Sequence, residues 1–338
     1  MHDMTGPATV PLPTTLCDAI ALAMTEMHGA TAVRIESAAY EYRTSFPVSR
    51  LDIVLSDGRV IAAVCKELSR SRLSADALRA KPAALFDPMR EIEVYRRILR
   101  DAHLGTAALI AVAEAGPEGG PWLVIEQVRG VELYQVGDLA GWCAAAEWLA
   151  RMHERLGWVA GDGVAAGHLL RLGPDDWRLM GRRALARGAG SAPVAARERL
   201  ARSHDSVVAR LEAMPNAFLH GDAYASNILV DDPVAPRRVC AVDWEMAAVG
   251  PALLDLAALT AGEWPLDAVA AMATAYRRTL SAPSPWRAGE ETLRTALDAC
   301  RCQLALQWLG WDSSWSPPRE HRHDWLGTAM AALDGLGL

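Results

Sequence analysis

One loop between two short apolar segments constrains this chain more than any other part of its sequence. It reads Phe-Leu-His-Gly-Asp-Ala-Tyr-Ala-Ser-Asn-Ile-Leu-Val over residues 218–230, and Ala-Val-Asp-Trp-Glu follows over residues 241–245. Asn227 comes five residues after Asp222, and Asp243 closes another apolar segment farther along the chain. A simple turn also favours Asp and Asn, but it would not require this order and spacing.

Three polar side chains in this order suit a particular chemistry. Phosphoryl transfer from a magnesium nucleotide needs one carboxylate for the acceptor hydroxyl, and an amide oxygen and a second carboxylate for the metal. Protein kinases carry them as His-Arg-Asp, an Asn five residues after the Asp, and then Asp-Phe-Gly. Here the frame is His-Gly-Asp, an Asn at the same distance, and then Asp-Trp-Glu.

This frame resembles that of the aminoglycoside phosphotransferase and choline kinase family, whose members phosphorylate small molecules. The Gly250-Pro251 turn and the Leu-Asp-Leu-Ala run over residues 254–257 are similar to the family's continuation. The resemblance covers roughly residues 32–260 and implies an α+β, protein-kinase-like two-lobed fold. A small antiparallel β lobe with one helix would precede a larger, mostly helical lobe.

Domain boundaries follow from the resemblance and from the hydrophobic pattern. We expect an N-terminal tail and helix over residues 1–29 and a nucleotide-binding N-lobe over 30–128. A C-lobe with the catalytic loop, the metal site and the acceptor-binding helices would occupy 129–338. Within it, residues 181–197 predict a loop or weak helix, and residues 202–213 predict a helix.

The resemblance also implies a role for each polar residue around the loop. Asp222 would be the catalytic carboxylate, which orients the acceptor hydroxyl and accepts its proton. Asn227 and Asp243 would bind Mg²⁺ through oxygen atoms, which this hard ion prefers. His220 would brace the loop by hydrogen bonding, and Asp255 would tie the loop down from a neighbouring segment.

A lysine and a glutamate upstream form a second candidate pair. An Asp-Gly turn at residues 57–58 between two β-rich runs predicts a hairpin, and it places Lys66 near the end of the second strand. This is the position of the phosphate-binding lysine in kinase-like folds. In the helical segment that follows, Glu91 lies on the apolar face and is the candidate partner of Lys66. Glu93 lies on the face that carries arginines and would form solvent-exposed ion pairs with them along the helix.

The resemblance to kinase-like folds also implies two further segments that contact the nucleotide. Residues 38–50 contain no glycine, so Thr44 and Ser45 would replace the glycine-rich loop that usually covers the phosphates. Glu126, Gln127 and Val128 would form the hinge that hydrogen-bonds the adenine through main-chain groups. The departure from the glycine-rich pattern leaves the choice between ATP and GTP open.

The acceptor is constrained only weakly by the sequence. Residues 251–338 carry ten acidic residues and seven arginines. This is a low excess of acidic residues for a site that binds a polycationic aminoglycoside. Three tryptophans lie at helical spacing, Trp308, Trp311 and Trp315, and aromatic faces suit flat or sugar-like ligands. The alternative for each of them is a packing role in the hydrophobic core. We therefore expect a sugar-bearing or aromatic natural product, such as an antibiotic. Glu245 would contact the acceptor, assist the metal, or be structural.

Composition excludes several other classes of protein. The formal net charge is −7 and hydrophobic residues make up 51% of the chain, which argues against a nucleic-acid partner and against disorder. We expect no membrane span and a cytoplasmic monomer or homodimer with its six cysteines reduced. The alternatives are a nucleotide-binding pseudokinase scaffold, a protein kinase, and a kinase of a primary metabolite such as choline or a sugar.

Overall fold

The chain forms two compact units, one from Met1–Asp101 with Ala107–Val128 and the other from Ala102–Thr106 with Arg129–Leu338. The computed structural model describes residues 11–40, 45–75, 78, 83–117, 119–163, 166–186, 193–231, 238–287, 289–310 and 323–338.

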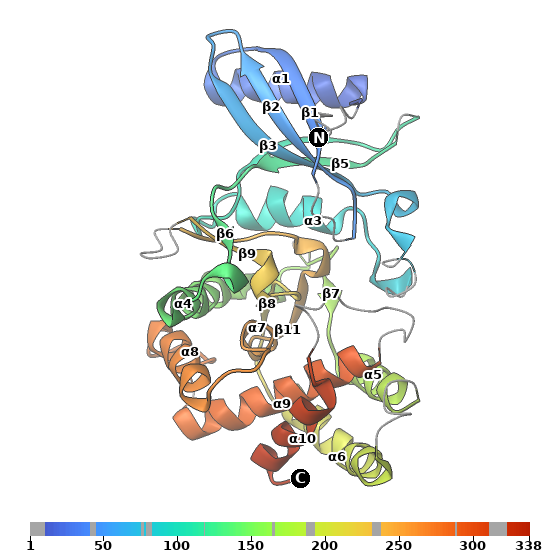
Figure 1. The fold of residues 1–338 in the computed structure, drawn as a ribbon, viewed down its shortest axis with the longest axis vertical. Coiled ribbons are helices and arrows are strands. Elements are labelled where there is room, and N and C mark those ends of the chain that lie inside the picture. The colour runs from blue at the N-terminus through green and yellow to red at the C-terminus, as the bar shows by residue number, and fades with distance from the viewer. Residues whose placement is uncertain are drawn as a thin grey trace, which may run out of the picture. The chain divides into compact units, whose positions relative to one another are not determined.

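The first unit is built on an antiparallel sheet of five strands (Figure 1). In spatial order the strands are β1 (Ala32–Ala39), β2 (Val48–Leu55), β3 (Val60–Glu67), β5 (Trp122–Glu126) and β4 (Leu109–Ala113). Strands β2 and β3 contain the two β-rich runs that were predicted on either side of the Asp-Gly turn. The antiparallel sheet of the α+β prediction is confirmed.

The predicted hairpin joins β2 to β3. Val54 pairs with Val60, and the register continues to Val48 opposite Lys66. Gly58 takes φ +86° in the turn, a conformation that glycine adopts without strain. The hairpin thus sets Lys66 near the end of β3, as the sequence predicted.

Helix α1 (Thr14–His28) covers one face of this sheet (Figure 1). Leu16, Ile20 and Met24 are fully buried and belong to the same hydrophobic core as Leu51 and Ile53 of β2. The sequence predicted this helix but not its place in the core of the first unit.

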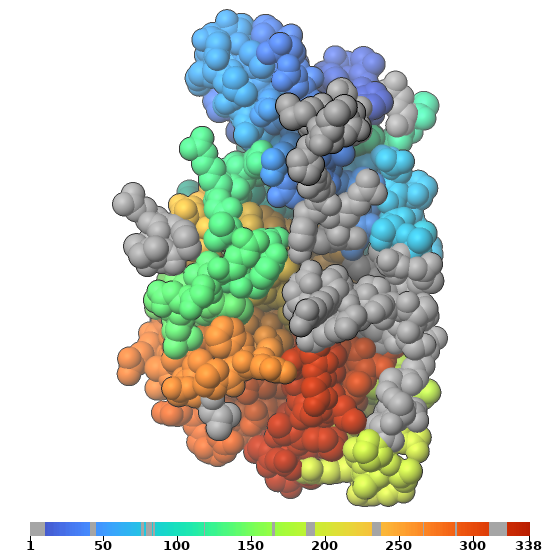
Figure 2. Space-filling model, viewed as in Figure 1, coloured from blue at the N-terminus to red at the C-terminus, as the bar shows by residue number. Residues whose placement is uncertain are grey.

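The second unit is mostly helical, as predicted. Helices α4 and α8 pack together, and in Figure 2 they cover adjacent green and orange parts of one face. Of the loop or weak helix predicted over residues 181–197, almost all of the described part is helical, since α5 extends through Ala186 and α6 begins at Val194. The helices are α4 (Leu139–Arg155), α5 (Pro174–Ala186), α6 (Val194–Glu212), α7 (Leu253–Leu259), α8 (Leu266–Thr279), α9 (Glu290–Leu309) and α10 (Trp325–Leu336).

Two small sheets frame the loop that the motif predicted. One has the order β10-β9-β6 and the other β7-β11-β8. Their strands are β6 (Val131–Glu132), β7 (Leu170–Arg171), β8 (Asn216–Leu219), β9 (Ile228–Val230), β10 (Val239–Ala241) and β11 (Ala248–Pro251). Because β8 and β9 flank residues 220–227, the loop is fixed at both ends by strand pairing.

Two composition-based expectations can be compared with the structure. Across the residues that it describes, no helix combines the length and apolarity needed to cross a bilayer. None of the six cysteines, all of which lie in the described part of the chain, is in a disulfide, and burial raises the pKa of the Cys65 and Cys302 thiols to about 12.

Candidate active site

The loop after β8 turns sharply at Gly221, directly before Asp222. Gly221 takes φ +79°, and a Cβ at this position would overlap the main-chain carbonyl oxygen of Met246. Only glycine avoids both the left-handed strain and this overlap. The turn follows the buried Leu219 and His220, and Asp222 is half-buried.

Asp222 and Asn227 are joined across this loop. The Asn227 side-chain nitrogen donates to the main-chain oxygen of Asp222 and to its carboxylate Oδ2, each at 2.9 Å. Since the nitrogen is used in this way, the amide oxygen of Asn227 faces away from Asp222. That oxygen accepts no hydrogen bond from the residues that the structure describes.

His220 connects Asp222 to the segment that carries Asp243. Its Nδ1 accepts a hydrogen bond from the Asp222 main-chain N–H at 3.3 Å, and its Nε2 lies 3.0 Å from the Val242 carbonyl oxygen. A main-chain N–H only donates and a carbonyl only accepts, so the ring carries its proton on Nε2. The contacts of this buried ring are those expected of a bracing residue.

Asp243 follows β10 at the same end of a hairpin as Asn227. The Val242 N–H donates to the Asn227 carbonyl at 2.9 Å, one step beyond the last pair of the β9–β10 register. Asp243 is 8% exposed and takes φ 66° and ψ 67°, which is uncommon for a residue other than glycine. Backbone strain of this kind is concentrated at functional sites. The next residue, Trp244, is stacked on Phe218 with ring centroids 5.7 Å apart, and this packing holds the main chain beside Asp243.

Asp255, in the first turn of α7, holds the loop by hydrogen bonds to its main chain. Its Oδ2 accepts from the His220 main-chain N–H at 2.8 Å, and its Oδ1 accepts from the Gly221 N–H at 2.9 Å. The carboxylate is 1% exposed, so these bonds replace the water that burial removes. His153 lies against it, with Nε2 3.1 Å from Oδ2.

In the first unit, Lys66 and Glu91 form a buried ion pair. Lys66 Nζ lies 2.9 Å from Oε1 and 3.1 Å from Oε2 of Glu91. Glu91 belongs to α3 (Arg90–Glu93) and points inward. The pairing that the helical stripe predicted is confirmed. Removing either partner would leave an uncompensated buried charge.

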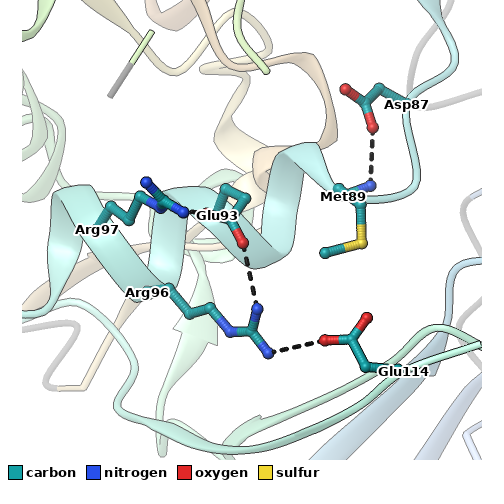
Figure 3. A network of polar contacts seen from close by, with 6 residues as sticks. All are labelled: Asp87, Met89, Glu93, Arg96, Arg97 and Glu114. Carbon is teal, nitrogen blue, oxygen red and sulfur yellow. Dashed lines mark hydrogen bonds and ion pairs between the residues drawn. The ribbon is translucent and has the colours of Figure 1, made fainter. Parts of the chain in front are cut away.

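Glu93 forms the predicted pairs with arginines, which Figure 3 shows, but the prediction that it is solvated is wrong. Its carboxylate pairs with Arg97 and with Arg96, whose Nη1 lies 3.2 Å away. Glu93 is nevertheless buried, with 7% exposure, and Arg96 continues to Glu114 at 3.3 Å. The chain runs as a π-helix over Val94–Leu99, which departs from the 3.6-residue repeat on which the prediction rested.

The predicted hinge residues differ in what their main chain offers. The Glu126 N–H donates to Ala108 and the Gln127 N–H donates to Ala62, at 2.8 and 3.1 Å. These two donors are therefore used within the sheet. The N–H of Val128 makes no hydrogen bond within the described part of the chain, so it is the donor of the three that a ligand could reach.

The segment predicted to cover the phosphates is only partly described. Thr44 lies outside the described residues. Ser45 is 7% exposed, and its carbonyl accepts from the Ser74 N–H at 2.9 Å. Phe46 packs against Phe86 with ring centroids 6.3 Å apart. These contacts fix the main chain at the edge of the predicted segment.

Half-buried aromatic rings extend from the loop to the C-terminal helices. The Trp308 indole N–H donates to the Tyr224 hydroxyl, and Trp308 is stacked on Trp325 with centroids 5.2 Å apart and an interplanar angle of 3°. Burial, reinforced by the charge of Asp222, raises the pKa of the Tyr224 phenol well above its usual value. Trp311 and Trp315 lie outside the described residues, and Glu245 is half-buried in the turn after Asp243.

Two further residues were not predicted to belong to the site. Tyr224 stands two residues after Asp222, and an aromatic hydroxyl inside the motif was a usable signal. Tyr276 lies on α8 and contacts His153 at 2.8 Å. No local pattern indicates that contact, because the two residues are 123 positions apart.

Comparison with known proteins identifies a family and several similar structures. The APH family model, described as the phosphotransferase enzyme family, matches residues 72–293. A GDP complex of a mutant aminoglycoside 2'-phosphotransferase-IIIa is 13% identical with a TM-score of 0.53, and the match covers 93% of this chain and 94% of that one. A microcompartment-associated aminopropanol kinase is 17% identical with a TM-score of 0.54, over 93% and 94% of the two chains.

A choline/ethanolamine kinase family protein from Mesorhizobium loti is 16% identical with a TM-score of 0.51, over 96% of this chain and 94% of that one. Similarity at this level of identity shows the fold, and the predicted protein-kinase-like α+β fold is confirmed. No curated protein matches the sequence.

Proposed function

Since the chain belongs to the phosphotransferase enzyme family, we propose that it is a Mg²⁺-dependent kinase that transfers the γ-phosphate of ATP or GTP to a hydroxyl group of a small molecule. The observation that carries this proposal is the loop in which Asn227 holds the Asp222 carboxylate and His220 connects it to the segment of Asp243. Asp222, Asn227 and Asp243 are the residue types that phosphoryl transfer requires for the acceptor hydroxyl and the metal.

Asp222 is the proposed catalytic base. As the acceptor oxygen forms its bond to phosphorus, the bond from the γ-phosphorus to the bridging oxygen breaks and the nucleoside diphosphate leaves. The hydroxyl proton passes to the Asp222 carboxylate. The bond from Asn227 Nδ2 to Oδ2 fixes the direction of this carboxylate before the acceptor binds, and such positioning contributes to rate together with proton removal.

Asn227 and Asp243 are the proposed magnesium ligands. Their donor set fits the ion, because an amide oxygen and a carboxylate at one end of the β9–β10 hairpin are hard oxygen donors. When bound, Mg²⁺ offsets the negative charge that develops on the phosphates.

Nucleotide binding is assigned to residues of the first unit. The Lys66 ammonium, oriented by Glu91, would bind phosphate oxygens, and Thr44 and Ser45 would cover them. The main-chain N–H of Val128 would donate to the base, beside Glu126 and Gln127. GTP remains part of the proposal beside ATP, since a protein of the same fold was solved with GDP.

Changes to the metal ligands give the first test. We expect Asn227→Ala and Asp243→Asn each to weaken Mg²⁺-nucleotide binding by about tenfold or more, because each removes an oxygen ligand or its charge. Nucleotide binding without Mg²⁺ should change little. Isothermal titration with and without EDTA measures both, and unchanged Mg²⁺-dependent affinity in the two variants would remove these residues from the metal site.

For the acceptor, we propose a sugar-bearing or aromatic natural product, consistent with a biosynthetic or self-resistance kinase. The support is the row of half-buried rings that begins at Tyr224 and continues through Trp308 and Trp325. Aromatic faces bind planar groups and the apolar faces of sugar rings. The other proposed acceptor contacts are Glu245, Trp311 and Trp315.

Trp308→Ala tests the acceptor assignment. We expect KM for the acceptor to rise about tenfold and KM for the nucleotide to stay within twofold, because a ring that stacks on the acceptor touches no phosphate group. Trp158→Ala is the control, since Trp158 is 51% exposed. Equal effects of the two substitutions on acceptor KM would contradict the assignment.

A further inference from the structure

A buried chain of hydrogen bonds leads from helix α8 to the backbone of the catalytic loop. The Tyr276 hydroxyl lies 2.8 Å from His153 Nδ1, and His153 Nε2 lies 3.1 Å from Asp255 Oδ2. Asp255 then accepts from the main-chain N–H groups of His220 and Gly221. Tyr276 and His153 are 0% exposed and Asp255 is 1% exposed, so water cannot replace a missing partner.

The protons of this chain can be assigned from donors and acceptors. Both oxygens of Asp255 accept from main-chain N–H groups, which only donate. His153 Nε2 must therefore carry a proton to bond Oδ2 favourably. Burial and the nearby charge of Asp255 raise the pKa of Tyr276 well above its usual value, so the phenol keeps its proton.

The hydroxyl proton of Tyr276 then has one acceptor within the described residues, His153 Nδ1. An imidazolium at His153 would place a proton on Nδ1 and leave the phenol proton without a partner. The neutral ring with its proton on Nε2 is the state that satisfies every donor and acceptor of the chain.

We infer that Tyr276 is a positioning residue for the phosphoryl transfer, because its hydroxyl holds His153 in the Nε2–H tautomer that orients Asp255 under the catalytic loop. This inference rests on the proposed function for its catalytic part. The loop conformation depends on Asp255, since Gly221 is held at a positive φ next to Asp222. A ring of the opposite tautomer would aim a lone pair at Asp255 Oδ2 and weaken its hold.

The first test needs no activity and no substitution in the measured protein. In protein labelled with ¹⁵N-histidine, the His153 nitrogens should show a protonated Nε2 and an unprotonated Nδ1 at pH 7. The His153→Gln variant assigns the signal by its loss. A protonated Nδ1, in either an imidazolium or the other neutral tautomer, would overturn the inference.

The second test removes only the hydroxyl. We expect Tyr276→Phe to accelerate hydrogen exchange in residues 218–223 about tenfold, and to lower kcat of MgATP hydrolysis, with water as acceptor, by a similar factor. KM for MgATP should stay within twofold. Thr279→Val is the matched control, because it removes a hydroxyl whose one hydrogen bond within the described residues is to the Ala275 carbonyl on the same helix.

A double-mutant cycle separates positioning from general stability. A glutamine at position 153 has an amide donor near Nε2 but no tautomers, so Tyr276→Phe should have little effect on loop exchange in the His153→Gln background. Equal effects of Tyr276→Phe in both backgrounds would overturn the inference. If the wild type does not hydrolyse MgATP, the nitrogen signals and the loop exchange still test the role of Tyr276. Failure of the proposed function can therefore be distinguished from failure of this inference.

Discussion

Asp222→Asn is expected to lower phosphoryl transfer by about 10³-fold, within the range that a positioned general base contributes. The substitution keeps the size of the side chain and leaves an oxygen that can still accept from Asn227 Nδ2, whose bond to Oδ2 measures 2.9 Å. The loop should therefore keep its conformation, and only the proton acceptor is lost. Affinity for the Mg²⁺-nucleotide, measured by isothermal titration, should stay within a few-fold of wild type.

Asp231→Asn provides the matched control for this experiment. Asp231 directly follows β9 and is exposed, and its side chain accepts from the Arg238 main-chain N–H. It should leave turnover near the wild-type value. Normal turnover in the Asp222→Asn variant would show that another group accepts the proton, and the assignment of the base would then be wrong.

Gly221→Ala is expected to destabilise the second unit by about 3–5 kcal/mol and to abolish activity. A residue other than glycine pays about 1–2 kcal/mol for the left-handed conformation, and the added Cβ would overlap the Met246 carbonyl oxygen. Because that oxygen belongs to main chain, the loop must shift to relieve the overlap. Thermal unfolding should show a decrease in Tm of about 10 °C.

Gly337→Ala isolates the conformational part of this cost. Gly337 takes φ +66°, and a Cβ there would meet no atom within 4 Å. We expect a loss of about 1 kcal/mol and unchanged turnover. If the two glycine variants lost equal stability, the contact between Gly221 and Met246 would not be what fixes the turn.

Features encoded in short stretches of the sequence could be predicted. The Asp-Gly turn fixed the β2–β3 hairpin, and the apolar stripe of one helix identified Glu91 as the partner of Lys66, which the buried pair confirms. The spacing from Asp222 to Asn227 identified both residues as members of one candidate site, and the structure joins them by hydrogen bonds across the loop.

Features that depend on contacts between distant segments could not be predicted. Tyr276 reaches His153 only through the packing of α8 on α4. The short strands β8 to β11 have too few residues for a periodic pattern, and their pairing is what holds the loop. Directly after Glu93, the π-helix over Val94–Leu99 departs from the regular helical repeat on which the prediction for Glu93 rested.

One measurement tests the central claim most directly. The protein would be incubated with Mg²⁺ and either ATP or GTP, against a panel of hydroxyl-bearing antibiotics, nucleosides, sugars and choline, and each acceptor examined by mass spectrometry. The proposed function predicts a phosphate added to at least one sugar-bearing or aromatic acceptor, lost with EDTA and in Asp222→Asn. Nucleotide binding without transfer to any acceptor or to water would contradict the claim and indicate a nucleotide-binding scaffold.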